Sequence, residues 1–128
     1  MKSCYLAIVV ALCSTQLGIG SDFKLPATDE NVPGQGTLRR HGWFQNLWEK
    51  RRSAWAKQVQ QDQGALVFLG DSITQGWGGN LSKSFPEVKV ANRGISGDTT
   101  RGVLLRLEED VLKLNPSGVV ILIGTNDL

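Results

Sequence analysis

The chain has 128 residues, of which 41% are hydrophobic and 20% are charged, and its formal net charge is +2. This length accommodates one domain at most, with the composition of an ordinary globular protein. The small net charge gives no reason to expect a nucleic-acid partner, and no apolar run is long enough to predict a membrane span. Both cysteines, Cys4 and Cys13, lie near the start, so the rest of the chain has no disulfide, cysteine-based zinc site or cysteine nucleophile.

Residues 1–20 have the pattern of a secretory signal peptide. The start is positively charged, residues 5–12 form an apolar segment too short to cross a bilayer, and Gly18 and Gly20 place small side chains before a cleavage site preceding Ser21. A buried N-terminal helix is the alternative interpretation, but the polar stretch that follows favours a signal. We therefore expect an exported protein, periplasmic or extracellular.

A polar arm and an amphipathic helix follow this segment. Residues 21–40 hold two prolines and two glycines, a composition typical of a linker or an extended arm. Apolar side chains then recur at helical spacing over residues 41–61. Three of them are the tryptophans Trp43, Trp48 and Trp55. They either pack the helix onto a sheet or form a platform for carbohydrate or lipid, and the amphipathic pattern favours packing.

Three short segments predict strands, of which the first is expected to be buried on both faces and the third to be buried. They span residues 65–69, 88–91 and 119–123. Glycines stop a short helix soon after the first strand, and a longer helix, capped by Asp98 or Thr99, is expected to run to about Leu114. Strands that alternate with helices in this way are typical of a parallel α/β sheet.

A polar loop follows each predicted strand, at residues 70–74, 94–99 and 124–127. Because the carboxyl ends of parallel strands meet at one edge of a sheet, we expect these loops to converge. Ser72 lies in the first loop, where a tight turn exposes its hydroxyl as a nucleophile. Gly97 offers a backbone N–H and Asn126 a side-chain amide, which with the Ser72 N–H would make three donors to the oxyanion of acyl transfer. Taken singly, each residue is equally well explained as a turn former.

Three motifs resemble the first three blocks of the GDSL, or SGNH, hydrolase family. They are Gly70-Asp71-Ser72-Ile73, Asn92-Arg93-Gly94-Ile95-Ser96-Gly97-Asp98-Thr99 and Gly124-Thr125-Asn126-Asp127. The resemblance covers residues 64–128 and is strong for members similar to the catalytic subunits of platelet-activating-factor acetylhydrolase. It implies a flavodoxin-like three-layer α/β/α fold and ester or thioester hydrolysis through an acyl-enzyme, without a metal or nucleotide cofactor. It also implies that Ser72 is nucleophile and oxyanion donor, with Gly97 and Asn126 as the other donors.

The sequence departs from the family pattern at the residue that serves as the catalytic base. The family's fourth block, Asp-x-x-His, has no counterpart, and the one histidine is His41, which we expect to cap a helix or lie exposed, since nothing orients it toward a serine. We therefore expect part of an exported esterase with an unpaired sheet edge, nearly inactive by itself. Asp71, Asp98 and Asp127 are expected to bind loop N–H groups, and Arg93 and Arg101 are expected to pair with Asp98 and Asp127.

The predicted organisation is a signal peptide at 1–20, an arm at 21–40 and the N-terminal part of an SGNH hydrolase domain at 41–128. The expected substrate is a small acyl ester, such as an acetylated sugar or a lysophospholipid. The first alternative is a non-catalytic exported carbohydrate-binding or pseudo-enzyme module. The second, a nucleotide-binding flavodoxin-like domain, is disfavoured because no phosphate-binding glycine motif follows a strand.

Overall fold

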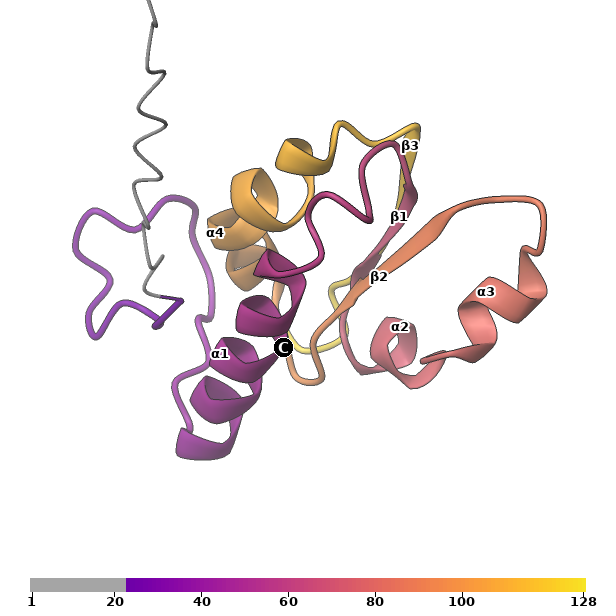
Figure 1. The fold of residues 1–128 in the computed structure, drawn as a ribbon. Coiled ribbons are helices and arrows are strands. Elements are labelled where there is room, and N and C mark those ends of the chain that lie inside the picture. Colours follow the sequence, from indigo (N-terminus) through magenta and orange to yellow (C-terminus); the bar gives the residue numbers. More distant parts are fainter. Residues whose placement is uncertain (1–22) are drawn as a thin grey trace, which may run out of the picture.

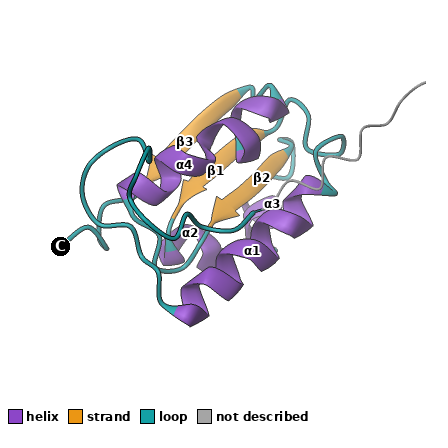
Figure 2. Cartoon of the chain, turned by 90° about the vertical axis from the view of Figure 1, so that its left-hand side faces the viewer, coloured by secondary structure: helices purple, strands orange, loops and turns teal. Residues whose placement is uncertain are grey.

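A three-stranded parallel sheet is the centre of the computed structural model, which describes residues 23–128 (Figures 1 and 2). Its strands β1 (Leu66–Gly70), β2 (Val90–Gly94) and β3 (Gly118–Leu122) lie in the order β2-β1-β3. This order is the one with which a flavodoxin-like sheet begins, and the prediction of a parallel α/β fold is confirmed. The predicted signal peptide lies outside the described residues.

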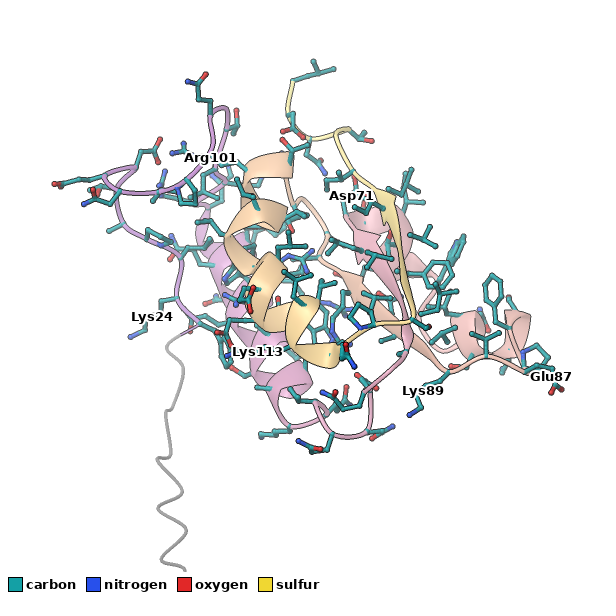
Figure 3. All side chains as sticks on the ribbon, turned by 90° about the horizontal axis from the view of Figure 1, so that it is seen from above. Lys24, Asp71, Glu87, Lys89, Arg101 and Lys113 are labelled. Atoms are coloured by element: carbon teal, nitrogen blue, oxygen red, sulfur yellow. The ribbon has the colours of Figure 1, made fainter. Side chains whose placement is uncertain are left out.

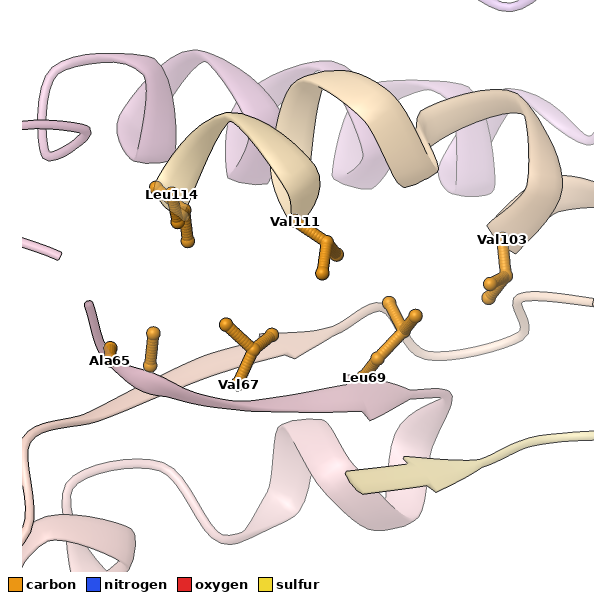
Figure 4. Close-up of a cluster of buried hydrophobic side chains, with 7 residues drawn as sticks. Ala65, Val67, Leu69, Val103, Val111 and Leu114 are labelled. Carbon is orange, nitrogen blue, oxygen red and sulfur yellow. The ribbon is translucent and has the colours of Figure 1, made fainter. Parts of the chain in front are cut away.

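Helices cover both faces of the sheet and complete three layers. Helix α1 (Gly42–Ala56), helix α4 (Thr100–Asp110) and the 3₁₀ helix η1 (Leu112–Leu114) lie on one face (Figures 1 and 4). The short helices α2 (Ser72–Gly76) and α3 (Asn80–Ser84) lie on the other. No helix within residues 23–128 is long and apolar enough to cross a bilayer.

Two hydrophobic clusters hold the helices on one face of the sheet. The first joins β1 and β2 to α4 and η1 through Ala65, Val67, Leu69, Ala91, Val103, Val111 and Leu114 (Figure 4). The second joins α1 to the end of β2 through Phe44, Trp48, Trp55 and Ile95. Trp48 and Trp55 are 1% and 7% exposed, which confirms packing and rules out a three-tryptophan platform. Only Trp43, at 54%, is exposed among the three tryptophans of α1.

Several predicted boundaries need correction. The first helix ends at Ala56, and the long second helix ends at Asp110, beyond which η1 begins. β2 starts later than predicted, at Val90, because Val88 still lies in the preceding bend. It also ends later, at Gly94, because Asn92 and Arg93 stay in the strand, where their polar side chains bind protein groups. β3 was expected to be buried, but its residues 119–122 are 38–59% exposed, since it is an edge strand with β1 as its neighbour.

Residues 23–40 fold back onto α4 (Figures 1 and 3). The buried Arg101 donates to the carbonyl oxygens of Val32, Pro33 and Gly36, over 3.1–3.3 Å. Its guanidinium also pairs with Asp29 at 2.8 Å, and the Thr99 hydroxyl donates to the Thr37 carbonyl at 2.7 Å. This segment is thus an arm bound along its length.

Candidate active site

The chain turns from strand to helix within two residues at the end of β1. A Cβ atom on Gly70 would collide with the Leu122 carbonyl oxygen and the Thr74 hydroxyl, so only glycine fits there. Asp71 caps α2, and its Oδ1 accepts from the Ile73 N–H at 3.0 Å. Ser72 is the first residue of α2 and is exposed. The turn therefore presents the Ser72 side chain to solvent at the carboxyl end of the sheet.

The second loop, residues 95–99, is mostly buried and held by internal hydrogen bonds. Gly97 has φ = +83°, a conformation that L side chains rarely adopt. The fully buried Asp98 accepts from the Thr99 N–H at 2.9 Å, and its own N–H donates to the Ile95 carbonyl at 3.0 Å. The Thr99 hydroxyl caps α4 by accepting from the Gly102 N–H at 3.1 Å. These bonds fix the backbone on the C-terminal side of Gly97.

Asn126 joins the third loop to the other two. Its Nδ2 donates to the Asp98 carbonyl at 2.9 Å and to the Asp71 carboxylate at 3.3 Å. These partners directly follow Gly97 and directly precede Ser72 in the chain, so the structure brings the three loops together as predicted. Asp127 adds a tie to α4 by accepting from the Thr100 N–H at 3.1 Å.

The three predicted oxyanion donors differ in their availability. Neither the Ser72 N–H nor the Gly97 N–H has an acceptor among residues 23–128. Both N–H bonds of the Asn126 amide are engaged, one strongly with Asp98 and one weakly, over 3.3 Å, with Asp71. The Ser72 and Gly97 N–H groups are thus free to bind an oxyanion, and the Asn126 amide can do so if it gives up its longer bond to Asp71.

Arg106 is the site residue that sequence reasoning missed. It is completely buried on α4, and its Nε donates to Asp98 Oδ2 at 2.8 Å. Its Nη2 donates to the Gly70 carbonyl at 3.2 Å and to the Arg93 carbonyl at 2.9 Å. One guanidinium therefore ties together the ends of β1 and β2 and the loop behind Gly97.

The predicted arginine partners of the site aspartates are wrong. Arg93 pairs with Asp62 at 2.6 Å and Arg101 pairs with Asp29, whereas Asp98 pairs with Arg106. Burial raises the pKa of the Asp98 carboxyl, and the Arg106 guanidinium opposes that rise. The available signal was the position of Arg106 in α4, three residues after the core residue Val103 and thus on the face toward the sheet.

His41 lies at the N-cap of α1, exposed and without a side-chain capping bond, in agreement with the expectation. His41 is the one histidine among residues 23–128, and no hydrogen bond joins it to Ser72. Two cavities, of about 210 and 410 Å³, are lined mainly by residues of α1, α4 and β2, and none of Ser72, Gly97 or Asn126 lines either. The candidate site therefore lies apart from these two cavities, at the carboxyl ends of the strands.

Known proteins resemble this chain in sequence over the region that carries the candidate site. The sequence model of the GDSL-like lipase/acylhydrolase family matches residues 68–128. The chain is 38% identical to an acetylxylan esterase of Geobacillus stearothermophilus in an alignment 86 residues long that covers 49% of this chain and 39% of that protein. It is 29% identical to platelet-activating factor acetylhydrolase IB subunit alpha1 of Bos taurus over 106 residues, covering 77% of this chain and 44% of that protein.

A solved GDSL-like lipase from Bacteroides thetaiotaomicron is 39% identical and superposes with a TM-score of 0.45, over 60% of this chain and 37% of that chain. The chain spans about two fifths of the length of these relatives. Residues 68–128 carry all three loops of the candidate site and belong to the GDSL-like lipase/acylhydrolase family.

Proposed function

We propose that the complete protein is a serine esterase that hydrolyses carboxylic esters through an acyl-serine intermediate on Ser72. The observation that carries the proposal is the Asn126 side chain, which binds the residues adjoining Ser72 and Gly97 and so assembles three loops at one edge of the sheet. Relatives named as an acetylxylan esterase and an arylesterase support ester bonds as the target.

We place the substrate carbonyl oxygen at the N–H groups of Ser72 and Gly97, neither of which has an acceptor among residues 23–128. Negative charge grows on this oxygen as the Ser72 hydroxyl attacks the carbonyl carbon, and preorganised donors stabilise it. The Asn126 amide becomes the third donor when the N–H of its 3.3 Å bond to Asp71 turns to the oxyanion. The shorter bond to the Asp98 carbonyl holds the amide in place meanwhile.

A base must accept the Ser72 proton and return it to the departing alcohol, after which water releases the acyl group. The family resemblance assigns this task to a histidine of the Asp-x-x-His block, and the only histidine of the sequence, His41, forms no hydrogen bond with Ser72. We infer that residues 21–128 alone hydrolyse esters poorly or not at all. We also propose that the protein is exported after cleavage before Ser21, which N-terminal sequencing of the mature protein tests.

A fluorophosphonate probe on the complete protein tests the esterase assignment. We expect the probe to label Ser72 and ester hydrolysis to stop when it does. Ser72→Ala is expected to abolish both, whereas the neighbouring Ser96→Ala retains them, since no hydrogen bond of the Ser96 hydroxyl occurs in residues 23–128. Undiminished ester hydrolysis by Ser72→Ala would refute the proposal.

A further inference from the structure

An exposed tryptophan lies beside the candidate oxyanion hole. Trp43, the second residue of α1, is 54% exposed, although the other two tryptophans of the helix are buried in the core. Its ring meets the buried Phe44 ring edge-on, with centroids 5.8 Å apart. The Phe44 ring therefore holds the Trp43 side chain in place, while much of the indole surface stays open to solvent.

Gly97 is in direct contact with Trp43 and with Arg39 of the arm. A Cβ atom built on Gly97 would lie 2.7 Å from Trp43 Cη2 and 3.0 Å from Arg39 Nη1. The Arg39 guanidinium carbon also lies 5.9 Å from the Trp43 ring centroid. The indole ring and the guanidinium thus form one surface against Gly97, which we call the Arg39–Trp43 pair.

The chemistry of this pair suits a sugar. One face of a pyranose ring is a layer of C–H groups that packs on an indole ring, and its hydroxyl and ring oxygens accept hydrogen bonds from a guanidinium. Both residues lie before residue 68, outside the segment that the family model matches.

We propose that the Arg39–Trp43 pair binds the alcohol part of the ester substrate, and that this part is a sugar ring. The assignment rests on the esterase activity proposed for Ser72. In an ester, the alcohol oxygen is two bonds from the carbonyl oxygen. When the carbonyl oxygen is held at the Gly97 N–H, a ring attached to the alcohol oxygen is close enough to reach Trp43. Arg39 then fixes the ring by hydrogen bonds at its edge.

The test compares two acetate esters that differ only in the alcohol, a monoacetylated methyl glucoside and ethyl acetate, with the complete protein. Trp43→Ala is expected to lower kcat/KM for the glucoside ester roughly tenfold or more, mainly through a higher KM, because truncating a tryptophan anchor removes its packing on the ring. Ethyl acetate, which has no ring, is expected to react as before. Trp43→Phe retains an aromatic face and is expected to preserve most of the preference for the glucoside ester.

Trp77→Ala is the matched control, because Trp77 is 45% exposed but packs on Phe68, 5.6 Å between centroids, on the opposite face of the sheet. It should leave both substrates unaffected. Equal losses for both esters in Trp43→Ala would show that Trp43 merely supports Gly97 and would overturn the proposal, as would no loss for either ester. A loss confined to a lysophospholipid ester would overturn the assignment of a sugar. If Ser72→Ala hydrolyses these esters as fast as the wild type, the esterase proposal itself is overturned instead.

Discussion

Arg106 and Asp98 form an ion pair of 2.8 Å in which neither side chain has any solvent exposure. The pair lies directly behind the loop of Gly97, and the same guanidinium holds the carbonyl oxygen of Gly70, two residues before Ser72. A buried arginine therefore sets the relative positions of the two backbone segments whose N–H groups we assign to the oxyanion hole.

Arg106→Lys is expected to lower kcat of the complete enzyme more than it changes KM. An ammonium group lacks the planar fork that reaches three acceptors at once, so the loops of Ser72 and Gly97 would shift relative to each other. Arg106→Met is expected to cost about 3–5 kcal/mol of folding stability, because it leaves Asp98 buried without its partner. Steady-state kinetics and thermal unfolding measure the two effects.

Lys113→Met is the control for Arg106, since it removes an exposed ion pair with Glu109 on the same side of the fold, with side chains 50% and 42% exposed. Such a pair contributes at most about 1 kcal/mol, and catalysis should not respond. An Arg106→Lys enzyme with wild-type kcat would contradict the positioning role.

Gly97→Ala is expected to destabilise the fold and impair turnover, since both φ = +83° and the contact with Trp43 disfavour a side chain. Gly36→Ala is the matched variant, because Gly36 has φ = +94° but no atom within 4 Å of an added Cβ. It is expected to show only the backbone strain, about 1–3 kcal/mol. Chemical denaturation compares the two, and equal destabilisation would contradict the close contact at Gly97.

Asn126→Ala is expected to lower kcat by about 10²–10³, the usual cost of one oxyanion donor. The substitution also removes the bond to the Asp98 carbonyl, so the Gly97 loop loses one tie. Asn126→Asp is expected to be at least as damaging, because it brings a carboxylate against Asp71. Kinetics of the purified variants decide, and a kcat within twofold of wild type in Asn126→Ala would remove Asn126 from the proposed hole.

Acidification is expected to loosen the arm on α4 around Asp29. Hydrogen bonds from Arg40 and Arg101 hold the pKa of Asp29 below its ordinary value of 3.8. Since the folded-state pKa is below the unfolded one, these contacts stabilise the folded arm in full above about pH 3.8 and are lost as the pH falls through the folded pKa. Hydrogen exchange of amides 29–36 against pH measures the loosening, with Asp29→Asn expected to remove this pH dependence. An Asp29 carboxyl that titrates above its ordinary pKa would contradict the prediction.

Local patterns in the sequence predicted which strand ends come together at the candidate site. Apolar runs followed by Gly-Asp-Ser, by the Gly94–Asp98 loop and by Gly-Thr-Asn-Asp identify strand ends, and parallel strands place such ends at one edge. Helical periodicity likewise indicated the buried faces of Trp48 and Trp55. These features depend on neighbours in the chain, which a sequence displays directly.

Contacts between distant residues could not be read in the same way. The pairing of Arg106 with Asp98, of Arg93 with Asp62 and of the arm with Arg101 depends on which helix face meets which loop. The exposure of β3 depends on the neighbours of the strand rather than on its apolar composition. The contact of Trp43 with Gly97 likewise arises only after α1 packs beside the end of β2.

Trapping of the covalent intermediate tests the central claim most directly. The complete protein is mixed with an acetate ester, quenched during turnover and digested for mass spectrometry. We predict that an acetyl group accumulates on Ser72 of the wild-type protein and that the Ser72→Ala variant carries none. Turnover without an acyl adduct on Ser72, or with the adduct on another residue, would contradict the account.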